Sequence, residues 1–290
     1  MSPWRALHLL ALSALLTACA TTRQSVPPAP DAAARGFQLV RALPEALPSE
    51  LSKVPDTQYL LVFAESTVLA VVDNLSPLPV SVMEPIEGVY HDHVAGQLKD
   101  RYASADPFAI ASERLQGSPL LTGRADALHT VPLVYLVEDS EDVFRATLVM
   151  RAEGEGWMGR YLYHMPTTYT DTQVRTAGPD MLASLRSDLQ QGSDVLRELM
   201  ERDARGELRG RDGRRVKYGS YHIVGSRVSG MLPASLVNFA GAQVIEEGAD
   251  HVVLRSPGNP ASGAREGALA FGVHHFRKDQ LHTFEPMSAN

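Results

Sequence analysis

The spacing of hydrophobic residues changes along this chain, and its middle part has the two-residue period of β-strands. Residues 131–137 are apolar on both faces, which is typical of a central strand. Residues 144–151 alternate between apolar and more polar positions, which predicts a strand with one buried face. Residues 157–166 continue as a third strand after a turn at residues 154–156. Three strands joined by tight turns predict an antiparallel meander.

Other segments have the period of three to four residues that is typical of helices. Over residues 86–102 an apolar residue recurs every four positions, which predicts an amphipathic helix. The Asp-Pro pair at residues 106–107 is a helix-start signal and predicts a short helix to about Leu115. Pro179 opens a longer helix, which we expect to pack on the core; a partner helix is the alternative. Gly192 in this helix marks a break or a close packing contact. The apolar stripe consists of Leu182, Leu185, Leu189, Gly192, Leu196 and Leu199.

Short apolar runs between turn residues predict the remaining elements. A short helix is expected to start at Pro233 and to end near Phe239. One hairpin is predicted around Gly248, and a last hairpin is predicted to turn at residues 278–280. The strands predicted in this way cover residues 59–63, 67–72, 216–224, 244–245, 251–254, 268–276 and 281–284.

These elements predict the α+β class, with an antiparallel sheet made of a meander and hairpins and with helices packed on one side. The soluble domain is expected over residues 36–290. The order of strand pairs, helix and further strands hints at two intimate halves split near residue 175. No residue-level repeat supports a duplication.

The first residues have the features of a secretory signal. Arg5 precedes a mostly apolar run over residues 6–18, and small residues precede Cys19, which is the single cysteine of the sequence. The run is shorter than the roughly 20 residues that a transmembrane helix needs. A plain secretory cleavage site and a retained membrane anchor are the alternatives to processing at the cysteine.

Residues 16–19, Leu-Thr-Ala-Cys, resemble the lipobox of bacterial lipoproteins. The resemblance implies that the signal peptide, residues 1–18, is removed and that Cys19 becomes lipidated, with palmitate-type chains on its sulfur and on the new N-terminus. It also implies attachment to a membrane of the bacterial cell envelope. Ala20 stands where an Asp often retains such proteins in the inner membrane, which favours the outer membrane, facing the periplasm. Residues 19–35, rich in Thr, Pro and Ala, are expected to form a flexible tether.

Composition limits the classes of partner and of stabilisation. The formal net charge of −7 argues against nucleic acid as a partner. The hydrophobic share of 44% is ordinary for a globular domain with a real core. Because the only cysteine is the lipidated one, no disulfide forms within the chain, and stability must come from burial.

Histidines provide the most metal-like cluster. His91 and His93 would share a face on a strand, and His274 would then serve as a third ligand, a donor set that suits zinc. The helical spacing of residues 86–102 instead puts His91 and His93 on opposite sides of a helix, so surface or capping histidines are the favoured interpretation. No metal and no cofactor is therefore assigned.

Known catalytic patterns are missing or fit a structural interpretation better. Gly154, Gly156 and Gly159 match G-x-G-x-x-G, but the chain continues as a strand after them, which indicates a turn rather than a nucleotide-binding loop. No serine stands in a G-x-S-x-G elbow, and no lysine follows a glycine as in a P-loop. A paired-carboxylate hydrolase stays open, because its acids are often far apart in sequence.

A basic segment near the end of the long helix is the main candidate for binding. It is suited to contact lipid phosphates or an acidic partner, and a solvated hairpin is the alternative. The arginines of this candidate surface are Arg209, Arg211, Arg214 and Arg215.

The sequence therefore predicts a lipid-anchored envelope lipoprotein whose periplasm-facing domain binds or assembles with a protein or glycan partner and is not an enzyme. One alternative is an envelope hydrolase, metal-assisted through His91, His93 and a C-terminal histidine. Another is an immunity or inhibitor lipoprotein, whose acidic surface would suit a basic target.

Overall fold

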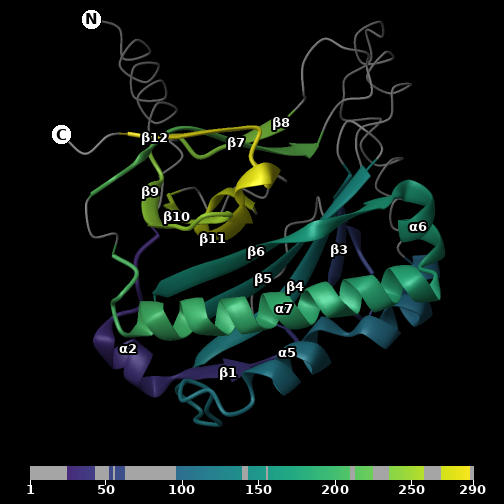
Figure 1. Ribbon diagram of the computed structural model, residues 1–290. Helices are drawn as coiled ribbons and strands as arrows, with labels where there is room; N and C mark the ends of the chain where they lie inside the picture. Colours follow the sequence, from purple (N-terminus) through teal and green to yellow (C-terminus); the bar gives the residue numbers. More distant parts are fainter. Residues whose placement is uncertain are drawn as a thin grey trace, which may run out of the picture.

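The chain folds into an α+β domain, which confirms the fold class predicted from the sequence. A helical layer covers one face of a large sheet, and a smaller sheet lies against part of its other face (Figure 1). The computed structural model describes residues 25–42, 52–54, 56–62, 96–138, 143–154, 156–209, 213–224, 235–257 and 269–287.

The predicted meander is the centre of the large sheet. Its strands are β4 (Leu128–Glu138), β5 (Val143–Gly154) and β6 (Trp157–Thr170), paired antiparallel in that order. Gly154 pairs with Trp157 across the turn, where Gly156 takes a φ of 76°. This turn confirms that the glycine pattern belongs to a hairpin, since a strand follows it instead of a helix.

Further strands extend the meander on both sides, and three of the pairings are parallel. On one side β1 and β3 run parallel to β4, and β2 pairs with β3. On the other side β11 runs parallel to β6 and continues to β10 and β9. The added strands are β1 (Phe37–Leu39), β2 (Ser52–Lys53), β3 (Tyr59–Val62), β9 (Gln243–Glu247), β10 (His251–Ser256) and β11 (Gly272–Arg277).

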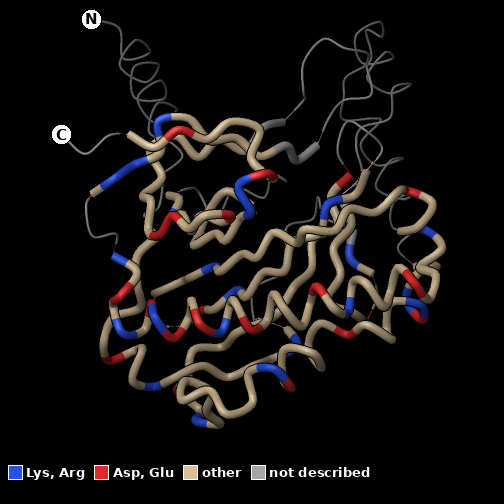
Figure 2. Tube along the Cα trace, in the orientation of Figure 1, with Lys and Arg blue, Asp and Glu red and all other residues tan. Residues whose placement is uncertain are grey.

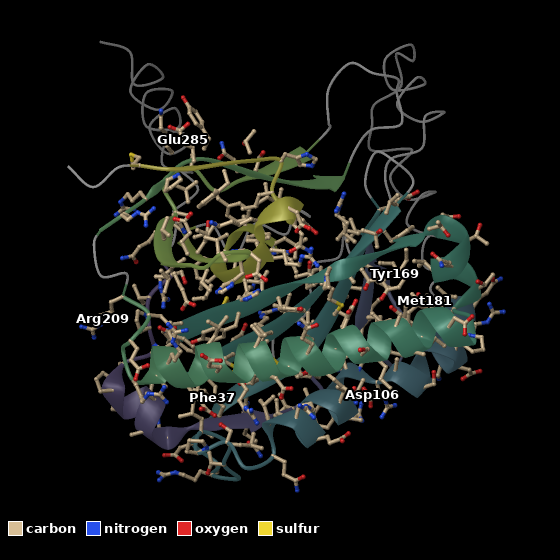
Figure 3. All side chains as sticks on the ribbon, viewed as in Figure 1. Phe37, Asp106, Tyr169, Met181, Arg209 and Glu285 are labelled. Carbon is tan, nitrogen blue, oxygen red and sulfur yellow. The ribbon has the colours of Figure 1, made fainter. Side chains whose placement is uncertain are left out.

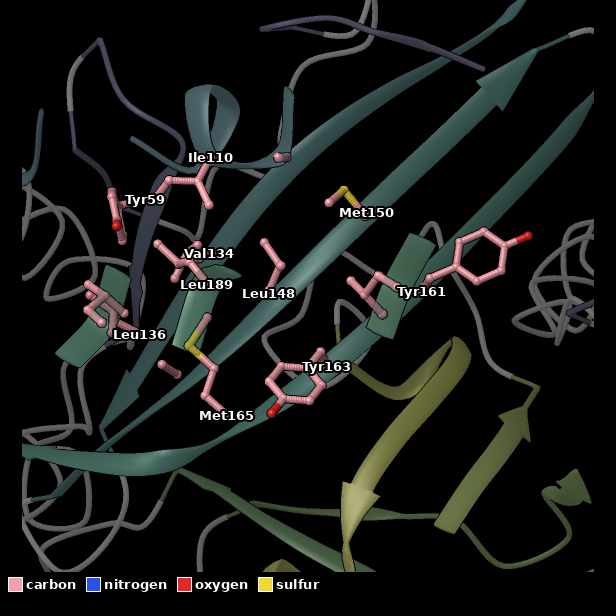
Figure 4. Close-up of a cluster of buried hydrophobic side chains, with 14 of the residues drawn as sticks. Tyr59, Ile110, Val134, Leu136, Leu148, Met150, Tyr161, Tyr163, Met165 and Leu189 are labelled. Atoms are coloured by element: carbon pink, nitrogen blue, oxygen red, sulfur yellow. The ribbon is translucent and has the colours of Figure 1, made fainter. Parts of the chain in front are cut away.

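The helical layer is built around α7, whose apolar stripe packs on the sheet as expected. Figure 4 shows Leu189 of this stripe among the buried side chains of the sheet. Asp106 caps α5 by accepting a hydrogen bond from the backbone N–H of Phe108 at 3.0 Å, which confirms the predicted start. Gly192 is a close packing contact, because a Cβ there would lie 2.6 Å from Cδ1 of Tyr163. The helices are α2 (Pro30–Arg35), η2 (Ala103–Ala105), α5 (Pro107–Leu115), α6 (Asp171–Thr176), α7 (Pro179–Ala204) and η3 (Lys278–Gln280).

A second, three-stranded sheet covers part of the opposite face and corrects one prediction. It consists of β12 (Thr283–Pro286), β7 (Val216–Val224) and β8 (Ser235–Asn238), in that order. The alternation along β5 predicts that one face of this strand meets water, but Thr147 and Arg151 on that face are buried. The prediction is wrong because both faces of β5 are covered, so the polar side chains on it lie inside the protein.

Two other elements differ from the predictions because of the strands with which they pair. The helix expected from Pro233 is instead strand β8 where the structure describes it, because this segment pairs with the edge of β7. The last predicted hairpin does not form: β11 joins the large sheet, while β12 joins the small one. Tertiary pairing overrides the local signal in both places.

The domain also begins earlier than the sequence indicates. Residues 30–35, expected within the tether, form α2 with Ala32 buried against the core. The division near residue 175 does not separate two sheets, since β6 and β11 lie on opposite sides of it and pair directly. Residues 96–102 of the predicted helix are helical; its earlier part and the strand over 67–72 lie outside the described residues. Of the described helices, none has the length and apolarity needed to cross a bilayer.

Candidate functional site

The structure describes only one of the three histidines that the sequence suggests as metal ligands. His91 and His93 lie outside the described residues. His274 lies on β11 and points between the two sheets, where its side chain is fully buried. Its Nδ1 lies 3.2 Å from Nε2 of His164, and Nδ1 of His164 lies 3.1 Å from the hydroxyl of Thr147. The two imidazoles therefore contact each other and a threonine inside the core.

The electrostatics of this histidine pair fit an interior position. Burial lowers the pKa of His274 to about 3 and lowers the pKa of His164 well below its usual value, with the proximity of His274 adding to the effect on His164. Both rings stack on Phe276, whose ring centroid lies 3.9 Å from that of His164 and 5.6 Å from that of His274. Neutral, stacked imidazoles are a structural feature of the layer between the sheets.

A second histidine group lies at the edge of the helical layer. His251 on β10 is held between two carboxylates, with Nε2 at 3.1 Å from Glu246 and Nδ1 at 3.1 Å from Asp250. These acids raise its pKa. Glu246 also pairs with Arg202 of α7 at 2.9 Å, so the group connects the sheet to the helix. Within the described ranges, no set of three or more His, Cys, Asp or Glu residues has the arrangement of a metal site.

The predicted basic segment divides into residues with different roles. Arg214 is neutralised by Glu247, to which its Nη2 donates at 2.9 Å. Arg215 is exposed and donates from Nη1 to the backbone carbonyl of Gly241 at 2.8 Å. Arg209 lies beyond the end of α7 (Figure 3), where its carbonyl accepts a hydrogen bond from Gln243. Arg211 lies outside the described residues.

Arg215 also lines a polar pocket that the sequence does not predict, and we call it the arginine pocket. It has a volume of about 110 Å³, which is enough for several water molecules or one compact polar group. Strands β9 and β10, the start of β7 and the N-terminal segment contribute to it. Its lining residues are Ser25, Arg215, Gln243, Arg255 and Pro257.

Arg255 is fixed at the base of the arginine pocket by a buried network. Its Nη2 donates to Oδ1 of Asp203 at 2.5 Å and to the carbonyl of Leu208 at 3.3 Å. The hydroxyl of Tyr161 donates to the other oxygen of Asp203 at 2.9 Å. The side chains of Arg255 and Asp203 are only 7% and 1% exposed, so this ion pair links α7 to β10 inside the protein.

Desolvation and ion pairing shift the pKa of Asp203 in opposite directions. Burial raises the pKa of this carboxyl, while Arg255, Tyr161 and Arg209 lower it. Arg255 has further donors: Nη1 lies 3.5 Å from the hydroxyl of Ser25, and Nε has no hydrogen-bond partner among the described residues. A buried guanidinium with unsatisfied donors is suited to an additional acceptor.

The N-terminal segment is packed beside the arginine pocket. Ser25 lines the pocket and is buried. The carbonyl of the next residue, Val26, accepts a hydrogen bond from Nε1 of Trp157 at 3.0 Å. The following helix α2 then packs against the core that α7 helps to form. The chain therefore enters the domain beside a pocket that contains Arg215 and Arg255.

The sequence pattern indicates only some of the residues at the arginine pocket. Arg209 and Arg215 stand out because they belong to a run of basic residues. Arg255 and Asp203 do not: Arg255 is the only arginine or lysine of β10, Asp203 is one of many charged residues of α7, and only the fold brings β10 against the end of α7. A signal exists in Arg255, which directly follows the apolar run at residues 252–254 and is buried like it.

Charge elsewhere on the molecule is mixed rather than segregated. Basic and acidic positions alternate along α7 and the hairpins (Figure 2). Comparisons with protein-family models, with curated proteins and with solved structures find no match to this chain. Function is therefore inferred from the residues and their geometry.

Proposed function

We propose that this protein is a lipid-anchored lipoprotein of the bacterial envelope, attached through Cys19, whose periplasm-facing domain is a binding or assembly module rather than an enzyme. The observation that carries the proposal is the packing of residues 25–35 into the domain. Only six residue steps separate Cys19 from Ser25, and such a segment spans at most about 20 Å. An acylated Cys19 would therefore hold the arginine pocket close to the bilayer surface.

The binding role is supported by how the titratable groups are used. His164 and His274 contact each other in the interior, and Asp203 is paired with Arg255. These groups stabilise the fold. The exposed Arg215 is different, because its hydrogen bond goes to a neutral carbonyl and its charge stays available to a partner at the pocket.

Lipid attachment has a direct test. Cells grown with labelled palmitate are expected to incorporate the label into the wild-type protein and not into Cys19→Ser, and only the wild-type protein should float with membranes. The matched control is Ser25→Ala, which keeps the cysteine and should remain labelled. Equal processing and equal membrane association of Cys19→Ser would remove the anchor from the proposal.

The position of the domain relative to the bilayer has a second test that needs no substitution. Removal of residues 1–18 leaves Trp157 as the only tryptophan, and this residue is bonded to the N-terminal segment. In reconstituted vesicles, energy transfer from Trp157 to a dansyl group on lipid headgroups should be strong. Transfer no greater than for a freely tethered tryptophan peptide would contradict a short, docked connection.

A further inference from the structure

We infer that the arginine pocket is a binding site for a phosphate group. The pocket is small and polar, and two of its five lining residues are arginines. A third guanidinium, that of Arg209, lies close enough to lower the pKa of Asp203. The inference rests on the proposed function only for how near the pocket lies to lipid headgroups.

Charge around the pocket favours an anion. Two arginines line it, while the acid nearest to Arg255, Asp203, pairs with that arginine on the side of α7. Arg215 pairs with no carboxylate among the described residues, since its hydrogen bond goes to the carbonyl of Gly241. A group that carries one or two negative charges would offset the remaining positive charge.

The donors on the pocket wall fit the oxygens of a phosphate. Arg255 directs Nη1 toward Ser25, leaving one of the two hydrogens on that nitrogen for an acceptor. The amide nitrogen of Gln243 uses one hydrogen for the carbonyl of Arg209 and retains a second. Planar guanidinium groups bind phosphate oxygens with paired, charge-assisted hydrogen bonds. The hydroxyl of Ser25 adds a neutral donor.

The location of the pocket indicates where such a group comes from. Ser25 lines the pocket, so Cys19 is within about 20 Å of it along the chain. The phosphodiester of a lipid headgroup and a free phosphate ester share the chemistry that the pocket recognises. The volume of about 110 Å³ admits the phosphate and excludes the rest of a lipid, which would extend out of the mouth.

The test measures binding by the full processed protein in neutral detergent micelles. Inorganic phosphate, water-soluble dihexanoyl phosphatidylglycerol and acetate are titrated separately and followed by calorimetry. Saturable binding of the diester assigns the site to a lipid headgroup, and saturable binding of inorganic phosphate alone assigns it to a free phosphate. No saturable binding of either up to about 10 mM, or equally tight binding of acetate, would overturn the inference.

Two neighbouring arginines provide a matched comparison. Arg215→Met should weaken binding of the phosphate probe by about tenfold or more, because a charge-assisted hydrogen bond is lost. Arg214→Met removes the same charge from the same segment, but Arg214 is paired with Glu247 and does not line the pocket, so the loss should stay below about threefold. Equal losses would mean general electrostatic attraction and no site.

This experiment is independent of the anchor. If Cys19 carries no acyl chain, the pocket still binds phosphate in the micelle assay, and the headgroup assignment alone is withdrawn. If the anchor is present and the titration fails, the phosphate inference fails while the proposed membrane attachment stands.

Discussion

At the scale of single residues, Gly192 shows how tightly α7 lies on the sheet. A Cβ at this position would lie 2.6 Å from Cδ1 and 3.2 Å from Cγ of Tyr163, close to the fixed end of that ring. Gly192→Ala should therefore destabilise the protein by about 1–3 kcal/mol, despite the better helix propensity of alanine. Urea denaturation measures the change.

Gly96 is the matched control for this substitution. It also lies in a helix, but among the described residues no atom is within 4 Å of a Cβ placed there. Gly96→Ala should leave the free energy of unfolding unchanged or raise it slightly. If both alanine variants behave alike, the packing of Gly192 on Tyr163 is not a constraint.

The buried histidines predict how stability depends on pH. His274 has a pKa of about 3 in the folded protein, whereas an unfolded histidine has a pKa of about 6.5. Its neutral form stabilises the fold above pH 6.5, and this contribution is lost as the pH falls from about 6.5 toward 3. The loss should amount to about 1.4 kcal/mol per pH unit within that window.

The variant His274→Phe keeps an aromatic ring but removes the titratable imidazole. Its free energy of unfolding, measured between pH 7 and pH 4.5, should fall less steeply than that of the wild type. His251→Gln should instead alter the slope above pH 6.5, where measurements are extended to about pH 9: the pKa of His251 is raised, so its contribution is complete below about pH 6.5 and is lost as the pH rises. If the unfolding free energies of all three proteins depend on pH in the same way, neither histidine contributes to the pH dependence of stability.

At the scale of elements, the ion pair between Asp203 and Arg255 joins α7 to β10. Asp203→Leu or Arg255→Met alone leaves a buried charge without its partner, so each should destabilise the fold by about 3–5 kcal/mol. The double variant should be destabilised by much less than the sum, since neither charge remains. Denaturant unfolding of the wild type, the two single variants and the double variant gives the coupling free energy between Asp203 and Arg255. Strictly additive losses would mean that the two side chains do not stabilise the fold as a pair.

Hydrophobic periodicity predicts well those elements whose buried positions follow the same pattern from end to end. The stripe of α7 and the apolar run of β4 predict a helix and a doubly covered strand, because their neighbours reinforce the local preference. The proline before residues 235–238 predicts a helix there instead of the strand that forms. The strand depends on the edge of β7, which no local pattern reveals.

The candidate site is predictable to a smaller extent. Arg215 lies in a visible basic run, so the sequence points to one wall of the pocket. Arg255 and Ser25 come from positions 230 residues apart and meet only through folding. Nothing in the spacing of either residue indicates the other.

At the scale of the whole molecule, the N-terminal segment is part of the domain. Nε1 of Trp157 donates to the carbonyl of Val26, and α2 packs on the core. Trp157→Phe removes this hydrogen bond and should lower stability by about 1 kcal/mol. Hydrogen exchange of residues 25–35 should also become faster.

A second aromatic residue shows whether this effect is specific. Tyr218 on β7 is 55% exposed, so Tyr218→Phe should change neither the unfolding free energy nor the exchange of residues 25–35. Faster exchange in both variants would mean that the segment responds to general destabilisation.

The parallel pairing of β11 with β6 has a consequence for the order in which the chain matures. Strand β6 ends at Thr170, but its neighbour is synthesised about one hundred residues later, at Gly272–Arg277. Until then the outer rim of the meander offers unpaired amides and carbonyls, a template for association with other nascent chains. Ribosomes that stop before β11 would therefore release aggregation-prone fragments, and only a polypeptide synthesised through Arg277 can close that rim.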